Sequence, residues 1–198
     1  MINTHTNESG RSMIEMLGVL AIIGVLSVGG IAGYSQAMSK FKVSKTTDQV
    51  QTMVTNIRTL FAGQRSYAGL TGENAYTMGI LTDETWDGTK ATNAYGGEII
   101  LSTFTGDNPH YFAITYNDLP QDACVRMVMS DWGDASSGLV GLDVKGTAGT
   151  KLEAVPSTKD QAFLTADKAV PLSLSDAVTA CAKGAKSDNT SSIAWVYR

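Results

Sequence analysis

The strongest constraint on this chain is a run of uncharged residues close to its amino end. The run extends from Met16 to Tyr34, 19 residues in all, and follows the acidic residue Glu15. A helix of about 20 residues, rising ~1.5 Å per residue, crosses a hydrocarbon core about 30 Å thick. The run is apolar on every side, whereas a core helix of a soluble domain is usually amphipathic. The sequence therefore predicts a membrane-spanning helix.

Two ordinary explanations of such a run are a cleaved secretory signal and a single-pass membrane anchor. A secretory signal has a basic front and an apolar stretch of about 7–15 residues. Residues 1–10 contain no Lys or Arg, and the apolar run is longer than a signal requires. An anchor accounts for the length but not for Glu15. An ionisable group in a spanning helix costs roughly 2–3 kcal/mol if it is drawn toward the centre, which makes Glu15 a candidate functional residue.

The residues around Glu15 resemble the processing signal of type IV prepilins, because GRSMIE, residues 10–15, precedes a long apolar helix. The resemblance implies that a prepilin peptidase cleaves between Gly10 and Arg11 and methylates the new amino terminus on Arg11. It also implies that Glu15 pairs with the amino terminus of a neighbouring subunit in an apolar fibre core, where charges attract more strongly than in water. The chain departs from the family pattern in one respect, since its mature form would begin with Arg11 rather than Phe, Met or Leu.

The lysines that follow the apolar run give a conflicting indication of orientation. Lys40, Lys42 and Lys45 favour a cytoplasmic carboxyl side by the positive-inside rule. The prepilin resemblance implies the opposite orientation, and the presence of two cysteines agrees with export, since disulfides persist in oxidising compartments. We therefore expect the head to lie in the periplasm while the chain is in the bacterial inner membrane, and outside the cell in the assembled fibre.

The helix is expected to continue beyond the apolar run. A helix from Met13 to Ala62 would be roughly 75 Å long, with Gly63 as its terminator. Gly29, Gly30 and Gly33 leave open whether it is one helix or an anchor followed by a separate soluble helix. In its second half, apolar residues at spacings of three and four form a single stripe: Val50, Met53, Val54, Ile57, Leu60 and Phe61.

The rest of the chain has the pattern of an α+β head. Strands are predicted at Glu98–Phe104, at Tyr111–Tyr116, in SGLVGLDV and in the closing SIAWVY. A short helix is predicted in NDLPQDACVRMVMSDWG, capped by Asn117 or Asp118 and ended by Gly133. A second is predicted in SLSDAVTACAKG, with a Ser cap and Gly184 as its stop. Its expected apolar stripe is Leu174, Ala177, Val178 and Cys181.

The chain has two cysteines, Cys124 and Cys181. In a cytosolic protein they would be buried thiols, whereas in an oxidising compartment they would pair and close a loop of ~58 residues, worth ~4 kcal/mol. The surrounding residues, HYFAITYNDLPQDACVRMVMSDWGD and ACAKG before IAWVY, resemble the type IVb pilins. That resemblance implies a Cys124–Cys181 disulfide bounding a carboxyl-terminal region that makes subunit contacts.

Three parts are expected on these grounds. Residues 1–10 form the prepilin leader, and residues 11–62 form the N-terminal helix, whose first half is transmembrane and later lies in the fibre core. Residues 63–198 form the globular head. The resemblance implies a pilin fold, in which the long helix packs on an antiparallel sheet.

Composition and motifs argue against an enzyme. A net charge of −4 offers no basic surface for nucleic acid. The two histidines, His5 and His110, do not combine with two distant cysteines into a zinc site, and no phosphate-binding loop has the required spacing. Asp131 and Asp134 are expected in a solvated loop. Large aromatic residues are expected to pack in the core: Trp86, Trp132, Trp195 and Tyr197. We expect no catalytic residue, cofactor or metal.

The resemblance thus implies the structural subunit of a type IVb pilus, which polymerises into a cell-surface filament for adhesion, aggregation or motility. Its expected partners are copies of itself, the prepilin peptidase, the inner membrane and the pilus assembly machinery. The alternative is a minor pilin or a type II secretion pseudopilin. The size of the head and its two cysteines favour the pilin.

Overall fold

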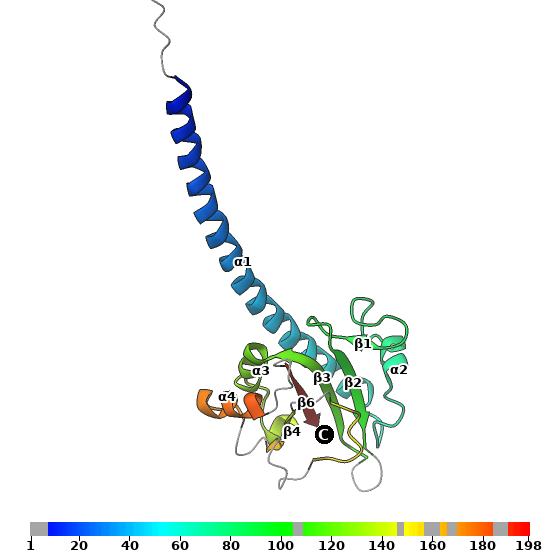
Figure 1. The fold of residues 1–198 in the computed structure, drawn as a ribbon. Helices are drawn as coiled ribbons and strands as arrows, with labels where there is room; N and C mark the ends of the chain where they lie inside the picture. Colours follow the sequence, from blue (N-terminus) through cyan, green and yellow to red (C-terminus); the bar gives the residue numbers. More distant parts are fainter. Residues whose placement is uncertain (1–7, 105–108, 146–148, 157–162, 166–169, 184–189) are drawn as a thin grey trace, which may run out of the picture. The chain divides into compact units, whose positions relative to one another are not determined.

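The computed structural model describes residues 8–104, 109–145, 149–156, 163–165, 170–183 and 190–198, with the backbone alone at residues 8–12 and 183. The chain divides into two compact units, Met1–Phe41 and Lys42–Arg198. Figure 1 shows their helices and strands.

Helix α1 extends from Glu8 to Leu60, 53 residues in one element. It passes through Gly29, Gly30 and Gly33 without a break, so the chain has one long helix rather than an anchor followed by a separate helix (Figure 1). The helix ends at Leu60, two residues before the predicted end, and Gly63 does not adopt the left-handed conformation of a glycine cap. The predicted terminator was therefore wrong.

In the second unit, α1 is amphipathic and buries one face. The predicted stripe is largely confirmed, because Val50 and Ile57 have no exposed surface and Met53 is 2% exposed. Leu60 was placed wrongly, since its side chain is 46% exposed at the end of the helix. The buried residues of α1 join those of the sheet in one core cluster, so burial of this face stabilises the head.

A six-stranded antiparallel sheet forms the centre of the second unit, in the order β1-β2-β3-β6-β4-β5. The last strand in the sequence lies between β3 and β4 and pairs with both, so the sheet is complete only when the carboxyl end of the chain is in place. The strands are β1 Ala91–Thr92, β2 Glu98–Thr103, β3 Phe112–Pro120, β4 Leu139–Lys145, β5 Phe163–Thr165 and β6 Thr190–Tyr197.

The four predicted strands are present as β2, β3, β4 and β6, and β2 pairs with β3 as a predicted hairpin would. Residues 105–108 of the predicted hairpin loop lie outside the described residues. The two short edge strands β1 and β5 were not predicted, because two or three residues are too few for an alternating pattern.

Helix α3, Gln121–Val128, begins later and ends earlier than predicted. Strand β3 continues to Pro120, and Asp118 has a positive φ of 54° at an irregularity in that strand. A residue that precedes proline is disfavoured in the helical conformation, so the helix begins only after Pro120, without a side-chain cap. Gly133 lies in the loop beyond the helix rather than at its end.

Helix α4, Leu174–Lys183, has the predicted serine cap. The Ser173 hydroxyl accepts a hydrogen bond from the Asp176 backbone N–H at 3.3 Å and donates one to the Asp176 carboxylate at 2.7 Å. The predicted stop at Gly184 lies outside the described residues. The described part of the head has two other short helices, α2 Gly72–Thr77 and the 3₁₀-helix η1 Ala135–Ser137.

The sheet buries apolar side chains on both faces. Phe112 and Ile114 of β3 and Trp195 of β6 belong to the main core, which also contains the buried faces of α1, α3 and α4. Alternate residues of the same strands, Ala113 and Val196, join a smaller cluster, as the two-residue period of a strand requires. Both clusters depend on β6, so the carboxyl-terminal strand anchors the whole head.

Candidate assembly surfaces

The first part of α1 exposes almost every apolar side chain that it carries. Leu20, Val25 and Leu26 are 60%, 75% and 68% exposed, and no part of the most apolar stretch of the helix is buried. By length and composition, α1 holds one candidate membrane span in the described part of the chain, and that span lies near the amino end. An apolar surface this continuous needs either lipid or other apolar helices around it.

The predicted processing and assembly residues lie at the start of α1. Gly10 and Arg11 fall in its first turns, where only the backbone is described. Glu15 is exposed on the helix. From Arg11 to Glu15 the chain rises only ~6 Å along the helix axis, so the acid would lie one turn from the proposed mature terminus. Cleavage, methylation and charge pairing stay predictions.

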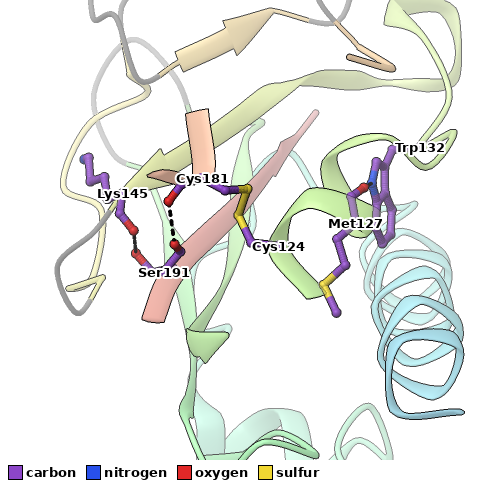
Figure 2. The surroundings of a disulfide bond; sticks show 7 residues. Cys124, Met127, Trp132, Lys145, Cys181 and Ser191 are labelled. Atoms are coloured by element: carbon purple, nitrogen blue, oxygen red, sulfur yellow. Dashed lines mark hydrogen bonds between the residues drawn. A yellow bond between two sulfur atoms is a disulfide. The ribbon is translucent and has the colours of Figure 1, made fainter. Parts of the chain in front are cut away.

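Figure 2 shows the disulfide between Cys124 of α3 and Cys181 of α4, with an S–S distance of 2.04 Å. Both cysteines have no exposed surface. The Ser191 hydroxyl at the start of β6 donates a hydrogen bond to the Cys181 carbonyl at 3.1 Å. The disulfide therefore joins α3 to α4 beside β6. It closes a loop of the chain that contains η1, β4, β5 and most of α4.

Helix α4 divides its predicted apolar stripe between two environments. Ala177 and Cys181 are fully buried, as the helical spacing predicts. Leu174 and Val178, the other two members of the stripe, are 61% and 44% exposed. Both lie at one edge of the stripe, where no part of the described head covers them. The sequence pattern could not separate the two pairs, because all four residues lie within one stripe of about 100°, the ordinary width of a core-facing stripe.

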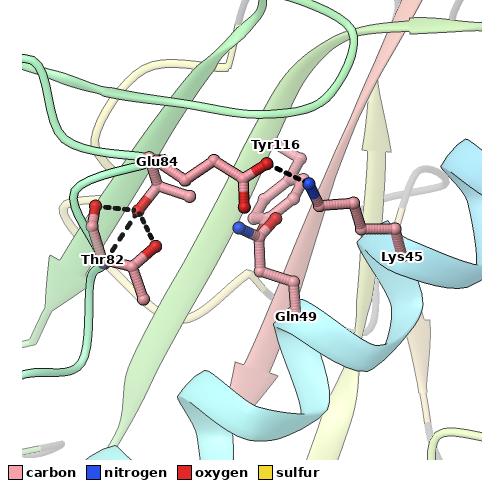
Figure 3. A network of polar contacts seen from close by, with 6 residues as sticks. Lys45, Gln49, Thr82, Glu84 and Tyr116 are labelled. Carbon is pink, nitrogen blue, oxygen red and sulfur yellow. Dashed lines mark hydrogen bonds and ion pairs between the residues drawn. The ribbon is translucent and has the colours of Figure 1, made fainter.

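A set of polar contacts attaches α1 to the rest of the head (Figure 3). Lys45 forms an ion pair with Glu84, whose carboxylate is mostly exposed. One turn further, Gln49 accepts a hydrogen bond from the Tyr116 hydroxyl at 3.1 Å, and burial raises the pKa of Tyr116 above its ordinary value. Sequence analysis missed these residues, since polar positions beside an apolar stripe give no indication of a distant partner.

His110, Asp131 and Asp134, the residues weighed for catalysis or metal binding, are all exposed. His110 is exposed next to Pro109. Asp131 accepts a hydrogen bond from the Gly133 N–H at 2.9 Å, and Asp134 caps η1, where hydrogen bonds from Ser136 and Ser137 lower the pKa of its carboxyl group. Across the described ranges, no three His, Cys, Asp or Glu residues gather as a metal site would require.

Three of the four predicted aromatic residues are buried in the core, and the fourth packs against it. Trp195 has no exposed surface, and Trp132 and Tyr197 are 5% and 4% exposed. Trp132 donates its indole N–H to the Met127 carbonyl at 2.6 Å (Figure 2). Trp86 is partly buried and stacks on Tyr76 with ring centroids 6.1 Å apart. The prediction of core packing is confirmed for Trp132, Trp195 and Tyr197, and Trp86 packs against the core from its edge.

Comparison with protein families gives a match over most of the chain. The model of the Bundlin family matches residues 36–198. This chain belongs to the Bundlin family.

Two relatives of this Bundlin-family chain carry the name "major structural subunit of bundle-forming pilus". The one from Escherichia coli O127:H6 (strain E2348/69 / EPEC) is 27% identical over 176 residues, 88% of each chain. The one from Escherichia coli O111:H- is 26% identical over the same length and shares.

Solved structures share the fold of this Bundlin-family chain. A type IVb pilin from Salmonella typhi has a TM-score of 0.54 at 20% identity, covering 78% of this chain and 99% of its own. TcpA, a type IV pilin from the El Tor biotype of Vibrio cholerae, has a TM-score of 0.57 at 15% identity, covering 79% and 99%. The predicted fold is confirmed: this chain has the long helix, the antiparallel sheet and the Cys124–Cys181 disulfide, and its fold is similar to that of solved type IV pilins.

Proposed function

We propose that this chain is the structural subunit of a type IVb pilus and polymerises into a filament on the cell surface. The observation that carries the proposal is the combination of a Bundlin-family head with an exposed apolar helix of membrane-spanning length. A single apolar helix serves both stages, because it is solvated by lipid before assembly and by copies of itself afterwards. The fibre then acts in adhesion, aggregation or motility.

The role is structural rather than enzymatic. Its chemistry is limited to processing of the chain by other proteins, namely cleavage after Gly10 by a prepilin peptidase and methylation of Arg11. Glu15 then neutralises the amino terminus of a neighbouring subunit inside the apolar core of the fibre, where an unpaired charge would be costly. The pilus assembly machinery supplies the work of extracting the helix from the inner membrane.

The location of the chain follows from the two stages. Before assembly α1 lies in the inner membrane and the head lies in the periplasm, where the Cys124–Cys181 disulfide is stable. After assembly the whole chain is extracellular. The names of both relatives, each a major structural subunit, support a major pilin over a minor pilin or a type II secretion pseudopilin.

Shearing of cells tests the proposal. The sheared material should contain this chain as an abundant band, and the intact mass of that band should correspond to a chain starting at a methylated Arg11. A trace band would favour a minor pilin. An intact Met1 terminus on a chain that stays in the membrane fraction would overturn both the processing and the fibre.

A further inference from the structure

Lys40 and Phe41 follow directly on the uncharged stretch of α1, and we refer to them as the interfacial pair. Both side chains are exposed, that of Phe41 to 59%. Within the described residues, Lys40 forms no ion pair or contact with an aromatic ring. The next two lysines differ, since Lys42 lies over an aromatic ring and Lys45 pairs with a carboxylate, both in the second unit.

The spacing of charges along α1 matches the thickness of a bilayer. No Asp, Glu, Lys or Arg occurs between Glu15 and Lys40, a distance of 25 residues in one unbroken helix. At ~1.5 Å per residue the two charged residues are about 37 Å apart. A hydrocarbon core is about 30 Å thick, and about 40–45 Å with its headgroup layers. When Glu15 lies in one headgroup layer, Lys40 therefore lies in the other.

The chemistry of the interfacial pair fits a lipid headgroup. Side chains of a helix lean toward its amino end, so the Lys40 ammonium and the Phe41 ring are directed back toward the membrane. A lysine stem lies along apolar surface while its ammonium reaches the phosphate layer, and an aromatic ring packs at the boundary of the acyl chains. The sequence offers no acid between Glu15 and Asp48 to neutralise the lysine.

We propose that the interfacial pair binds an anionic phospholipid in the non-cytoplasmic leaflet of the inner membrane. The Lys40 ammonium donates charge-assisted hydrogen bonds to the lipid phosphate, and the Phe41 ring contacts the upper part of the acyl chains. This inference rests on the proposed function, because it concerns the subunit before assembly. It also explains how a lysine is accommodated on the side of the span that the positive-inside rule disfavours.

Lipid retention tests the charge contact. The full chain is reconstituted in vesicles of phosphatidylglycerol and phosphatidylethanolamine, extracted in mild detergent and analysed by native mass spectrometry. Wild type should retain phosphatidylglycerol enriched about fivefold over the bulk lipid, and Lys40→Gln should retain the bulk ratio. Lys90→Gln, which removes an exposed lysine from the head, is the matched control and should behave as wild type.

The proposal fails if wild type shows no enrichment, or if Lys40→Gln retains it in full. Displacement of the lipid by inorganic phosphate at equal concentration would indicate a general anion site and would also overturn the assignment.

Depth-dependent quenching tests the ring contact. Fluorescence of Phe41→Trp should be quenched more by lipids brominated near the acyl carbonyl than by lipids brominated near the chain end. Leu26→Trp, near the middle of the span, should show the reverse order. The native tryptophans lie in the second unit and give a common background. Equal quenching of Phe41→Trp by both lipids, or none, would contradict the interfacial position.

These outcomes are separable from the fate of the proposed function. If the lipid preference is absent while Lys40→Gln cells still produce sheared filaments, only the lipid site is lost. If the chain neither inserts into membranes nor appears in filaments, the pilus function itself is wrong.

Discussion

Removal of the Cys124–Cys181 disulfide should be among the most damaging changes to the head. The two residues are 57 positions apart, so the bond closes a loop whose entropy in the unfolded chain is worth roughly 4 kcal/mol. That is a large share of the ~5–15 kcal/mol that separates typical folded and unfolded domains. Both cysteines are fully buried, so Cys124→Ala with Cys181→Ala adds a small packing loss but leaves no unpaired polar group.

The free energy of unfolding is measured by urea titration of the full chain in mild detergent. Fluorescence of Trp132 and Trp195 reports on the head, because both rings are buried and contact each other with centroids 4.9 Å apart. We expect the double variant to lose roughly 4 kcal/mol relative to the oxidised wild type. A loss below about 1 kcal/mol would refute the reasoning from loop entropy.

Accessibility of the bond gives a second measurement. Since neither cysteine has exposed surface, dithiothreitol should leave the native chain oxidised and reduce it only when urea opens the head. Alkylation followed by mass measurement detects the reduced form. Equally fast reduction with and without urea would show that the bond is not enclosed by α3, α4 and β6.

Three other predictions concern packing, backbone and titration. Ile57→Ala should destabilise the head by about 2–5 kcal/mol in urea titrations, because Ile57 is fully buried. Leu60→Ala, at an exposed position, should cost under about 1 kcal/mol, and equal losses would contradict the assignment of Ile57 to the buried face of α1. Gly97→Ala should destabilise the head by about 1–3 kcal/mol, because the new Cβ would lie 1.9 Å from the Asn117 carbonyl oxygen of β3. Gly63→Ala, whose Cβ would meet open space, should be near neutral, and a neutral Gly97→Ala would contradict this reasoning. Burial raises the pKa of Tyr197 from 10.0 to about 12, so its contribution to stability is full below pH 10 and falls by roughly 2 kcal/mol by pH 12. Burial also raises the pKa of Tyr95 to about 12, so Tyr197→Phe should reduce the tyrosinate absorbance that develops near pH 12 by the share of one tyrosine, and an unchanged amplitude would be inconsistent with the shift.

Much of the fold could be predicted because several elements have strong local patterns. The stripe of α1, the strand that closes the chain and the cap at Ser173 all depend on residues near one another in sequence. The start of α3 could not be predicted in this way, because Asp118 and Pro120 are typical of both a helix start and an irregular strand end. The insertion of β6 between β3 and β4 is a long-range pairing that no local pattern specifies.

Individual residues also differ in how far a local pattern reveals them. Glu15 stands out because a charge in an apolar run is rare, so a single sequence suffices to select it. The exposed pair Leu174 and Val178 did not stand out, since apolar residues at helical spacing are typical of a core. The hydrogen bond between Gln49 and Tyr116 joins residues 67 positions apart, so no local sequence pattern could predict it.

The central claim is that this chain enters a filament through α1, with Glu15 neutralised by a neighbouring subunit. The most direct measurement compares the amount of subunit in sheared filaments from cells that express wild type, Glu15→Gln or Glu153→Gln, an exposed control in the head. The account predicts that Glu15→Gln is folded, processed and retained in the membrane but absent from filaments, while Glu153→Gln assembles as wild type does. Filaments of Glu15→Gln at the wild-type level would contradict it.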